Sequence, residues 1–100
     1  MLNLDPKYLS LVRKILADHV PNKTVWAYGS RVKGTAHAGS DLDLVVVETK
    51  EDLLPETLSS LQAAFSESDL PITVDILNWS DIPDAFKEEI KKAHEVIQEP

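Results

Sequence analysis

The chain has 100 residues, a length that favours a single domain spanning residues 1–100 and excludes a large multidomain enzyme. Its 17 acidic and 10 basic residues give a net charge of −7, which disfavours direct binding to nucleic acid, and the absence of cysteine excludes disulfides, thiolate metal sites and cysteine nucleophiles. Residues 1–50 hold seven basic and five acidic side chains, whereas residues 51–100 hold three and twelve, so we expect any anion-binding site in the first half.

The first half is predicted to hold a helix, a strand and a loop, in that order. Asp5 and Pro6 are typical of a helix start, apolar residues then recur at helical spacing, and Pro21 ends the segment. Residues 24–28 are β-branched and aromatic, which indicates a strand. Residues 29–40 hold three glycines and show no sustained period, so we expect a loop with at most one helical turn.

The second half is predicted to alternate strands with helices. Residues 41–48 begin with alternating polarity and become wholly apolar, which is typical of an interior strand covered on both faces. A helix is expected from near Asp52 and Pro55, and a third strand at residues 72–77. Ser80 is expected to cap a final helix, whose apolar positions are Ile82, Phe86, Ile90, Ala93 and Ile97.

This order of elements predicts an α/β (α+β) fold. Helices interleaved with strands form a small mixed β-sheet of three to four strands flanked by helices. No apolar run approaches the roughly 18 residues that a membrane span requires, so we expect a cytoplasmic protein without a membrane partner. A domain of this size leaves little stability to spare for a deep pocket, which favours a partner protein or a homo-oligomer.

Three polar features of the predicted strands carry the candidate chemistry. Gly29-Ser30 follows the first strand, Asp41 and Asp43 open the next, and Asp75 lies inside the third. Side chains at positions i and i+2 of a strand share a face at about 6.5–7 Å backbone separation, so Asp41 and Asp43 can converge on one metal ion. An isolated carboxylate at Asp75 is costly unless it is paired, solvated or bound to a cation. A cation explains all three carboxylates together.

Each feature also has a purely structural explanation. Gly29-Ser30 can be a strand-ending turn, and Asp41 and Asp43 can be the polar start of a strand. Asp75 can be a solvated edge residue or a salt-bridge partner. All three explanations would have to hold at once, in this order and on these elements, so the combination favours a catalytic site.

The same residues resemble the signature of a known family. The sequence GSR at residues 29–31, SDLDL at residues 40–44 and an Asp on a later strand resemble the nucleotidyltransferase superfamily that includes DNA polymerase β-type enzymes. The short chain is similar in particular to the minimal nucleotidyltransferases, or MNT proteins, which are encoded beside HEPN-domain partners in bacterial and archaeal toxin–antitoxin pairs. The resemblance covers essentially the whole chain and implies the nucleotidyltransferase fold.

The resemblance implies a role for each motif residue. Nucleotide binding falls to Gly29, Ser30, Arg31 and Ser40, and metal binding and catalysis fall to Asp41, Asp43 and Asp75. The implied cofactor is Mg²⁺, as one ion or two, with Mn²⁺ as a substitute. Two such ions stabilise the attacking and leaving oxygens of an in-line displacement at the α-phosphorus, which expels pyrophosphate.

The reaction that the resemblance implies is transfer of a nucleoside monophosphate, AMP from ATP or the equivalent from another NTP, onto a hydroxyl of a partner protein. The implied acceptor is a tyrosine of a HEPN ribonuclease toxin, which the modification would silence. Two alternatives stay open: a non-catalytic subunit that neutralises its HEPN partner by contact, and a small-molecule nucleotidyltransferase of the antibiotic-modifying kind. The lack of an acceptor-binding domain disfavours the second.

Other aromatic and basic residues favour structural roles. Trp26 and Tyr28 are expected in the core or on a sheet face, and not as a base-stacking platform. Residues 87–92 are typical of a solvated helix face. Arg31 and Lys33 fall beside the predicted phosphate loop in the more basic half, and Arg31 is expected to contact a phosphate or a partner.

Overall fold

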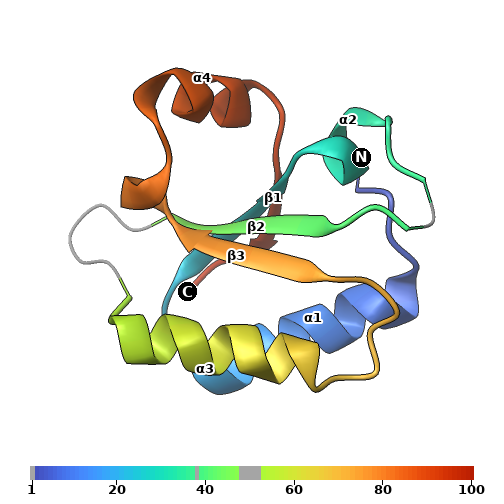
Figure 1. Cartoon of the computed structure of the whole chain (residues 1–100), viewed down its shortest axis with the longest axis vertical. Helices are drawn as coiled ribbons and strands as arrows, with labels where there is room; N and C mark the ends of the chain where they lie inside the picture. Colours follow the sequence, from blue (N-terminus) through green and yellow to red (C-terminus); the bar gives the residue numbers. More distant parts are fainter. Residues whose placement is uncertain (1, 38, 48–52) are drawn as a thin grey trace.

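The sheet of this protein lies between two layers of helices (Figure 1). The computed structural model describes residues 2–37, 39–47 and 53–100. The described elements, in chain order, are α1 (Pro6–His19), β1 (Thr24–Tyr28), α2 (Ser30–Lys33), β2 (Leu42–Val47), α3 (Pro55–Ser66), β3 (Val74–Asn78), the 3₁₀ helix η1 (Trp79–Asp81), α4 (Asp84–Lys92) and β4 (Glu95–Gln98). None of the described helices has the length and apolar content that crossing a membrane requires.

The strands form one mixed sheet in the order β3-β2-β1-β4. β1 runs antiparallel to both β2 and β4, and β2 runs parallel to β3. β2 therefore lies inside the sheet, as its apolar run predicted. The predicted fold class, a small mixed sheet flanked by helices, is confirmed, and the sheet has four strands.

The sheet separates two clusters of buried side chains. Successive residues of β2 face opposite sides, so Leu44 joins the cluster under α1 and α3 while Val45 joins the cluster under α4. The larger cluster consists of Val12, Leu16, Val20, Val25, Ala27, Leu42, Leu44, Val46, Leu53, Leu61, Phe65, Val74, Ile76 and Ile97. The smaller cluster consists of Tyr28, Val45, Ile82 and Ile90. The α4 face thus has less apolar cover, and the candidate site lies on it.

The first three predicted elements are confirmed. Asp5 caps α1, its carboxylate accepting a 3.0 Å hydrogen bond from the Lys7 N–H, and Pro6 occupies the first turn. β1 spans the predicted residues, and the loop after it holds the single short helix α2.

The next three elements are present with small shifts at their ends. β2 is confirmed, and Glu48, with which the predicted strand ended, lies outside the described residues. α3 begins at Pro55, as predicted, whereas Asp52 also lies outside the described residues. β3 begins at Val74 instead of Ile72 and runs to the end of the predicted segment and one residue beyond.

The prediction for the end of the chain is wrong in two respects. Ser80 lies in η1 and caps no helix, because α4 begins only after Pro83. A residue that precedes a proline disfavours the helical conformation, and Ile82 is accordingly extended. Ile97 belongs to β4 and not to the helix. Its spacing from Ile90 fits a helical period, but its neighbours Val96 and Gln98 pair with β1, and Ile97 itself is buried in the larger cluster.

Side chains pair with the backbone along the outer edge of β3. The Gln62 amide of α3 donates to the Val74 carbonyl and accepts a 3.2 Å hydrogen bond from the Ile76 N–H. At the end of the strand, the Asn78 side chain reaches the other way: it accepts a 3.1 Å hydrogen bond from the Leu53 N–H and donates one of 3.2 Å to the Leu53 carbonyl. Two backbone groups that this edge strand would offer to another chain, the Val74 carbonyl and the Ile76 N–H, are thus already bonded.

Candidate active site

Three polar side chains form a row across β1, β2 and β3. Tyr28 is the antiparallel partner of Asp43, and Asp43 is the parallel partner of Asp75. Residues directly paired across neighbouring strands lie on the same face of the sheet. The row lies on the face that α4 covers, because Tyr28 packs there with Val45 and Ile90.

Gly29 brings the loop backbone into contact with this row. Its φ of +79° and ψ of −156° place it in a region that is essentially open to glycine alone. An ideal Cβ built on Gly29 comes within 2.5 Å of Oδ2 of Asp43, so a side chain here would collide with the carboxylate. The predicted strand-ending turn and the predicted metal-binding carboxylate therefore lie together.

The electrostatics of the row centre on Asp43. Burial is the largest of the effects that raise the pKa of its carboxyl group above the ordinary 3.8, and the negative charges of Asp75 and then Asp41 raise it further. Asp41, just before β2, and Asp75 are themselves exposed. The half-buried Asp43 therefore lies between two other carboxylates that repel its charge.

This set of ligands fits a hard divalent cation by its chemistry. Mg²⁺ binds carboxylate oxygens and keeps several of its waters, so it does not require a cage of protein ligands. The described residues contain no group of three acidic or histidine side chains already gathered at metal-binding distance. What the structure supplies is the partly buried Asp43, with Asp41 and Asp75 near enough for their charges to raise its pKa.

Tyr28 lies at the β1 end of the row and is only 7% exposed. Burial, followed by the charges of Asp43 and Asp75, raises the pKa of its hydroxyl from 10.0 to about 12. Its phenol therefore stays protonated at physiological pH. The prediction that Tyr28 is a sheet-face residue is confirmed, but sequence reasoning missed that it lies beside the carboxylates. The signal was available, since Tyr28 immediately precedes Gly29 on the antiparallel neighbour of β2.

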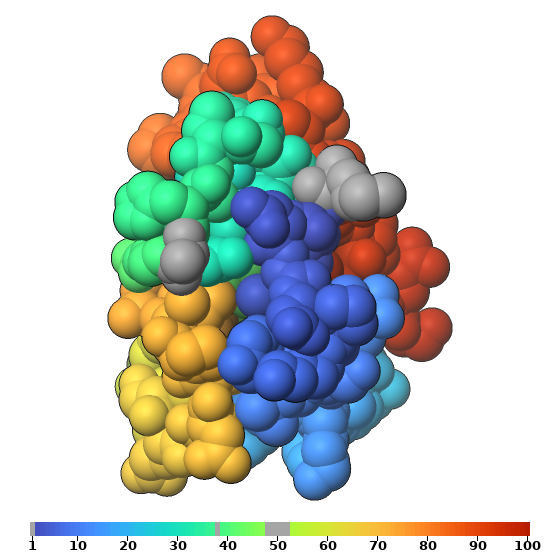
Figure 2. All heavy atoms as spheres, turned by 90° about the vertical axis from the view of Figure 1, so that its right-hand side faces the viewer, coloured from blue at the N-terminus to red at the C-terminus, as the bar shows by residue number. Residues whose placement is uncertain are grey.

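Arg31 is buried beneath the loop that follows β1. Its side chain is 6% exposed, with Nε donating to the Ser40 carbonyl at 3.0 Å and Nη1 donating to the Asn3 carbonyl at 2.7 Å. Figure 2 shows this loop, in teal and green, at the surface between the blue N-terminal segment and α4. These bonds hold the loop closed against the N-terminal segment, so Arg31 positions the loop. Its direct contact with a phosphate stays a prediction.

Ser30 and Ser40 lie at the two ends of the same loop. Ser30 is the half-buried first residue of α2 and directly follows Gly29. The Ser40 hydroxyl accepts a 2.9 Å hydrogen bond from the His37 N–H and shapes the turn before Asp41. The structure thus places Ser30 next to the carboxylate row, whereas these contacts make Ser40 part of the loop framework.

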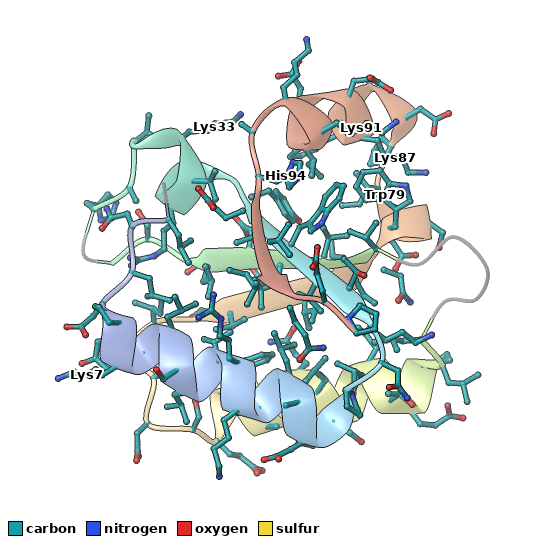
Figure 3. All side chains as sticks on the ribbon, turned by 180° about the vertical axis from the view of Figure 1, so that it is seen from behind. Lys7, Lys33, Trp79, Lys87, Lys91 and His94 are labelled. Atoms are coloured by element: carbon teal, nitrogen blue, oxygen red, sulfur yellow. The ribbon has the colours of Figure 1, made fainter. Side chains whose placement is uncertain are left out.

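An aromatic stack holds α4 and its flanking segments on the sheet. Trp26 of β1 stacks on His94, with ring centroids 3.9 Å apart, and meets Trp79 edge to face at 5.7 Å. Nδ1 of His94 lies 2.9 Å from the Ile90 carbonyl, and Lys87 lies with its ammonium 5.7 Å from the Trp79 ring (Figure 3). α4 is therefore fixed over the face that carries the row.

The sequence matches a known family of enzymes. Residues 11–100 match the family model described as "Polymerase beta, Nucleotidyltransferase". The chain belongs to this nucleotidyltransferase family. The predicted resemblance and enzyme class are confirmed, and members of the family generally use divalent metal ions.

One relative shares nearly the whole length of the chain. It is the Haemophilus influenzae (strain Rd) protein named "Probable protein adenylyltransferase MntA", and it is 47% identical to this chain over 98 residues. The match covers 98% of this chain and 85% of that protein.

Solved structures share the fold of this nucleotidyltransferase. A crystal structure of a toxin-antitoxin with AMP-PNP matches with a TM-score of 0.74 at 20% identity, covering 92% of this chain and 73% of that one. A structure of tri-AMPylated Shewanella oneidensis HEPN toxin in complex with MNT antitoxin matches with a TM-score of 0.63 at 17% identity and with the same coverage. At these identities the matches establish the nucleotidyltransferase fold.

Proposed function

We propose that this nucleotidyltransferase transfers AMP from ATP to a hydroxyl group of a HEPN-domain partner protein, with Mg²⁺ as its cofactor, and so acts as an antitoxin. The observation that carries the proposal is the contact between Gly29 and the Asp43 carboxylate, because it joins a phosphate loop to a metal-binding side chain. The name of the H. influenzae relative and its 47% identity support AMP as the transferred group. ATP as the donor also favours action in the cytoplasm.

Each residue of the row has a task in this reaction. Asp41, Asp43 and Asp75 would hold Mg²⁺, which supplies positive charge against the triphosphate. Gly29 lets the triphosphate approach the loop backbone, and the Ser30 hydroxyl donates a hydrogen bond to a phosphate oxygen beyond the transferred group. Positioning and neutralisation of charge provide most of the catalysis in phosphoryl transfer, so little covalent chemistry is asked of the protein.

The chemical step is an in-line displacement at the α-phosphorus. The acceptor hydroxyl oxygen bonds to this phosphorus while the bond to the oxygen bridging to the β-phosphate breaks, and pyrophosphate leaves. The hydroxyl proton passes to solvent at Asp75, which lies exposed on the edge strand β3. The acceptor therefore approaches from the β3 side of the row.

The acceptor has to come from another molecule. Asp41 and Asp75 are both exposed, so this part of the site is accessible to a second molecule. The second half of the sequence, with twelve acidic and three basic residues, favours a partner with a basic surface. A HEPN ribonuclease, which binds RNA, would carry such a surface.

The test is intact-mass analysis of a HEPN-domain protein encoded beside this chain, after incubation with the chain, ATP and Mg²⁺. A mass gain of one or more AMP units is expected, and it is lost in the double variant Asp41→Asn/Asp43→Asn. The matched control is Asp18→Asn/Asp69→Asn, which neutralises two exposed carboxylates away from the α4 face and keeps the activity. A complex that inhibits the partner with no change in mass would contradict catalysis and favour the non-catalytic subunit.

A further inference from the structure

Phe86 is a large apolar residue at the surface of α4. It was one of the regularly spaced apolar positions of the final helix, yet 45% of its surface is open to solvent. The chain has six aromatic residues, all among those described, and of these six only Phe86 is exposed. Aromatic rings at protein surfaces are a common means of contacting flat ligands.

Phe86 lies next to the carboxylate row. Its ring meets the Tyr28 ring edge to face, with centroids 5.9 Å apart and planes at 86°. Tyr28 in turn is close enough to Asp43 and Asp75 for both charges to raise its pKa. A T-shaped contact with Tyr28 covers at most one face of the Phe86 ring, and the exposed fraction leaves ring surface open beside the site.

Rigid support distinguishes Phe86 from a free surface ring. One turn further along α4, Ile90 is buried in the cluster beneath the helix. The neighbouring residue, Lys87, lies against Trp79, which meets Trp26 of the sheet. The Phe86 ring is therefore held in a set position, which lowers the entropy cost of stacking a ligand on it.

We propose that Phe86 forms the stacking surface for the nucleobase of the donor nucleotide. The proposal rests on the proposed function, because it requires a nucleotide at the carboxylate row. It gives the chain a base contact of its own, supplied by α4. The contact accepts any nucleobase, since every base has an aromatic face, and larger purine rings stack more strongly on it.

The position of Phe86 in the row favours the nucleotide over the acceptor. The strand order places Asp75 on β3 at one end and Tyr28 on β1 at the other, with Asp43 between them. The acceptor is proposed to enter at Asp75, whereas Phe86 contacts Tyr28. The Phe86 ring thus lies at the end of the row away from the acceptor. There it contacts β1, the strand that leads into the phosphate loop.

The test compares the affinities of ATP and inorganic tripolyphosphate for the full chain, measured with Mg²⁺ by NMR titration into the millimolar range. Loss of base stacking costs about tenfold in affinity by alanine substitution. We therefore expect Phe86→Ala to weaken ATP binding by about tenfold and to leave tripolyphosphate binding within about twofold, since that ligand has no base. Phe86→Trp should keep ATP affinity, and Phe86→Leu, which retains apolar bulk without a ring face, should behave like Phe86→Ala.

Two controls separate this inference from the proposed function. Leu54→Ala removes an apolar side chain that is 61% exposed at the start of α3, under the opposite face, and should change neither affinity. Asp43→Asn should weaken both ligands. If it leaves both affinities unchanged, or if the wild-type chain binds neither ligand, the proposed function fails and the inference with it.

The remaining outcomes contradict the stacking proposal alone. ATP affinity that survives Phe86→Ala while Asp43→Asn lowers it would remove the nucleobase contact. Equal weakening of both ligands would make Phe86 a structural support. Loss of AMP transfer to the partner protein with unchanged ATP affinity would make Phe86 a contact for the partner.

Discussion

The Asp43 carboxylate fills the space that a side chain at Gly29 would need, because a Cβ at Gly29 would lie 2.5 Å from Oδ2 of Asp43. We expect Gly29→Ala to displace the carboxylate and to force a residue with a side chain into a glycine-only conformation. This backbone conformation alone costs a residue with a side chain about 1–3 kcal/mol. Nucleotide binding should be lost as well, as measured by titration with ATP and Mg²⁺.

Gly34 provides the matched control for this prediction. Its φ is +82°, but nothing lies within 4 Å of a Cβ built there. Gly34→Ala should therefore show the backbone cost in thermal unfolding and retain ATP binding. If both variants bind ATP equally well, the contact between Gly29 and Asp43 has no part in the site.

The pH dependence of the free energy of unfolding should reveal that the charged form of Asp43 is disfavoured in the folded chain. Its pKa is raised above 3.8 by burial and by two neighbouring carboxylates, so the folded state holds the proton more tightly than the unfolded state. The free energy of unfolding then falls as pH rises through the interval between the unfolded and folded pKa values. In metal-free buffer we expect Asp43→Asn to be more stable than the wild type at neutral pH, with the gain shrinking as the pH falls through this interval.

Urea unfolding across a pH series, with a chelator present, measures this difference. Asp69→Asn, which changes an exposed carboxylate, is the control and should follow the wild type. Mg²⁺ should stabilise the wild type and leave Asp43→Asn nearly unchanged. An Asp43→Asn variant that is less stable than the wild type at neutral pH would show that the carboxylate has a favourable partner in the folded chain.

We expect Arg31 to affect ligand binding by stabilising the loop that follows β1. Arg31→Lys keeps the charge but cannot reproduce the two bonds to Ser40 and Asn3. We expect a loss of about 1–3 kcal/mol in the free energy of unfolding, the usual range for hydrogen bonds to a charged group. Lys33→Ala, at an exposed position on the same short helix, should leave stability unchanged.

Titration with tripolyphosphate distinguishes positioning from direct contact. A positioning role predicts that Arg31→Lys weakens binding in parallel with its loss of stability. Weaker binding with unchanged stability would overturn it and make Arg31 a phosphate contact.

Most of the site could be predicted because its residues are close in sequence or follow strand periodicity. Asp41 and Asp43 share a face by their spacing alone, and Gly29 ends the neighbouring strand. The burial of Arg31 could not be predicted, because one of its bonding partners is Asn3, which is 28 residues away. Local sequence holds no record of such a contact.

Periodicity predicted much of the fold, but the prediction from periodicity was wrong at the end of the chain. Ile90 and Ile97 are spaced as in a helix, but the residues on either side of Ile97 pair with β1, and Ile97 is buried in the larger cluster. The same pattern includes Phe86 among the apolar positions of the helix, yet its side chain is exposed. Periodicity indicates which side of a helix is apolar, but it cannot indicate where the layer beneath that helix ends.

We expect Gln62 to contribute more to the free energy of unfolding than an ordinary residue on a helix surface. Gln62→Ala removes bonds to the Val74 carbonyl and the Ile76 N–H and leaves both edge groups to water. We expect a loss of about 1–3 kcal/mol in urea unfolding. Ser59→Ala, at an exposed position of α3, is the matched control and should be neutral. Unchanged stability in Gln62→Ala would show that solvent replaces the amide without cost.

The bonded edge of β3 also restricts how a partner can deliver its hydroxyl. Asp75 lies on this strand, and Gln62 already bonds the Val74 carbonyl and the Ile76 N–H on either side of it, which an added strand would need. An acceptor segment therefore cannot reach Asp75 by extending the sheet. It has to come over the exposed face as a helix end or a loop, and recognise side chains instead of a backbone ladder. Such an approach selects acceptors by their surface shape and charge, and it leaves the acceptor hydroxyl free to advance as far as the row.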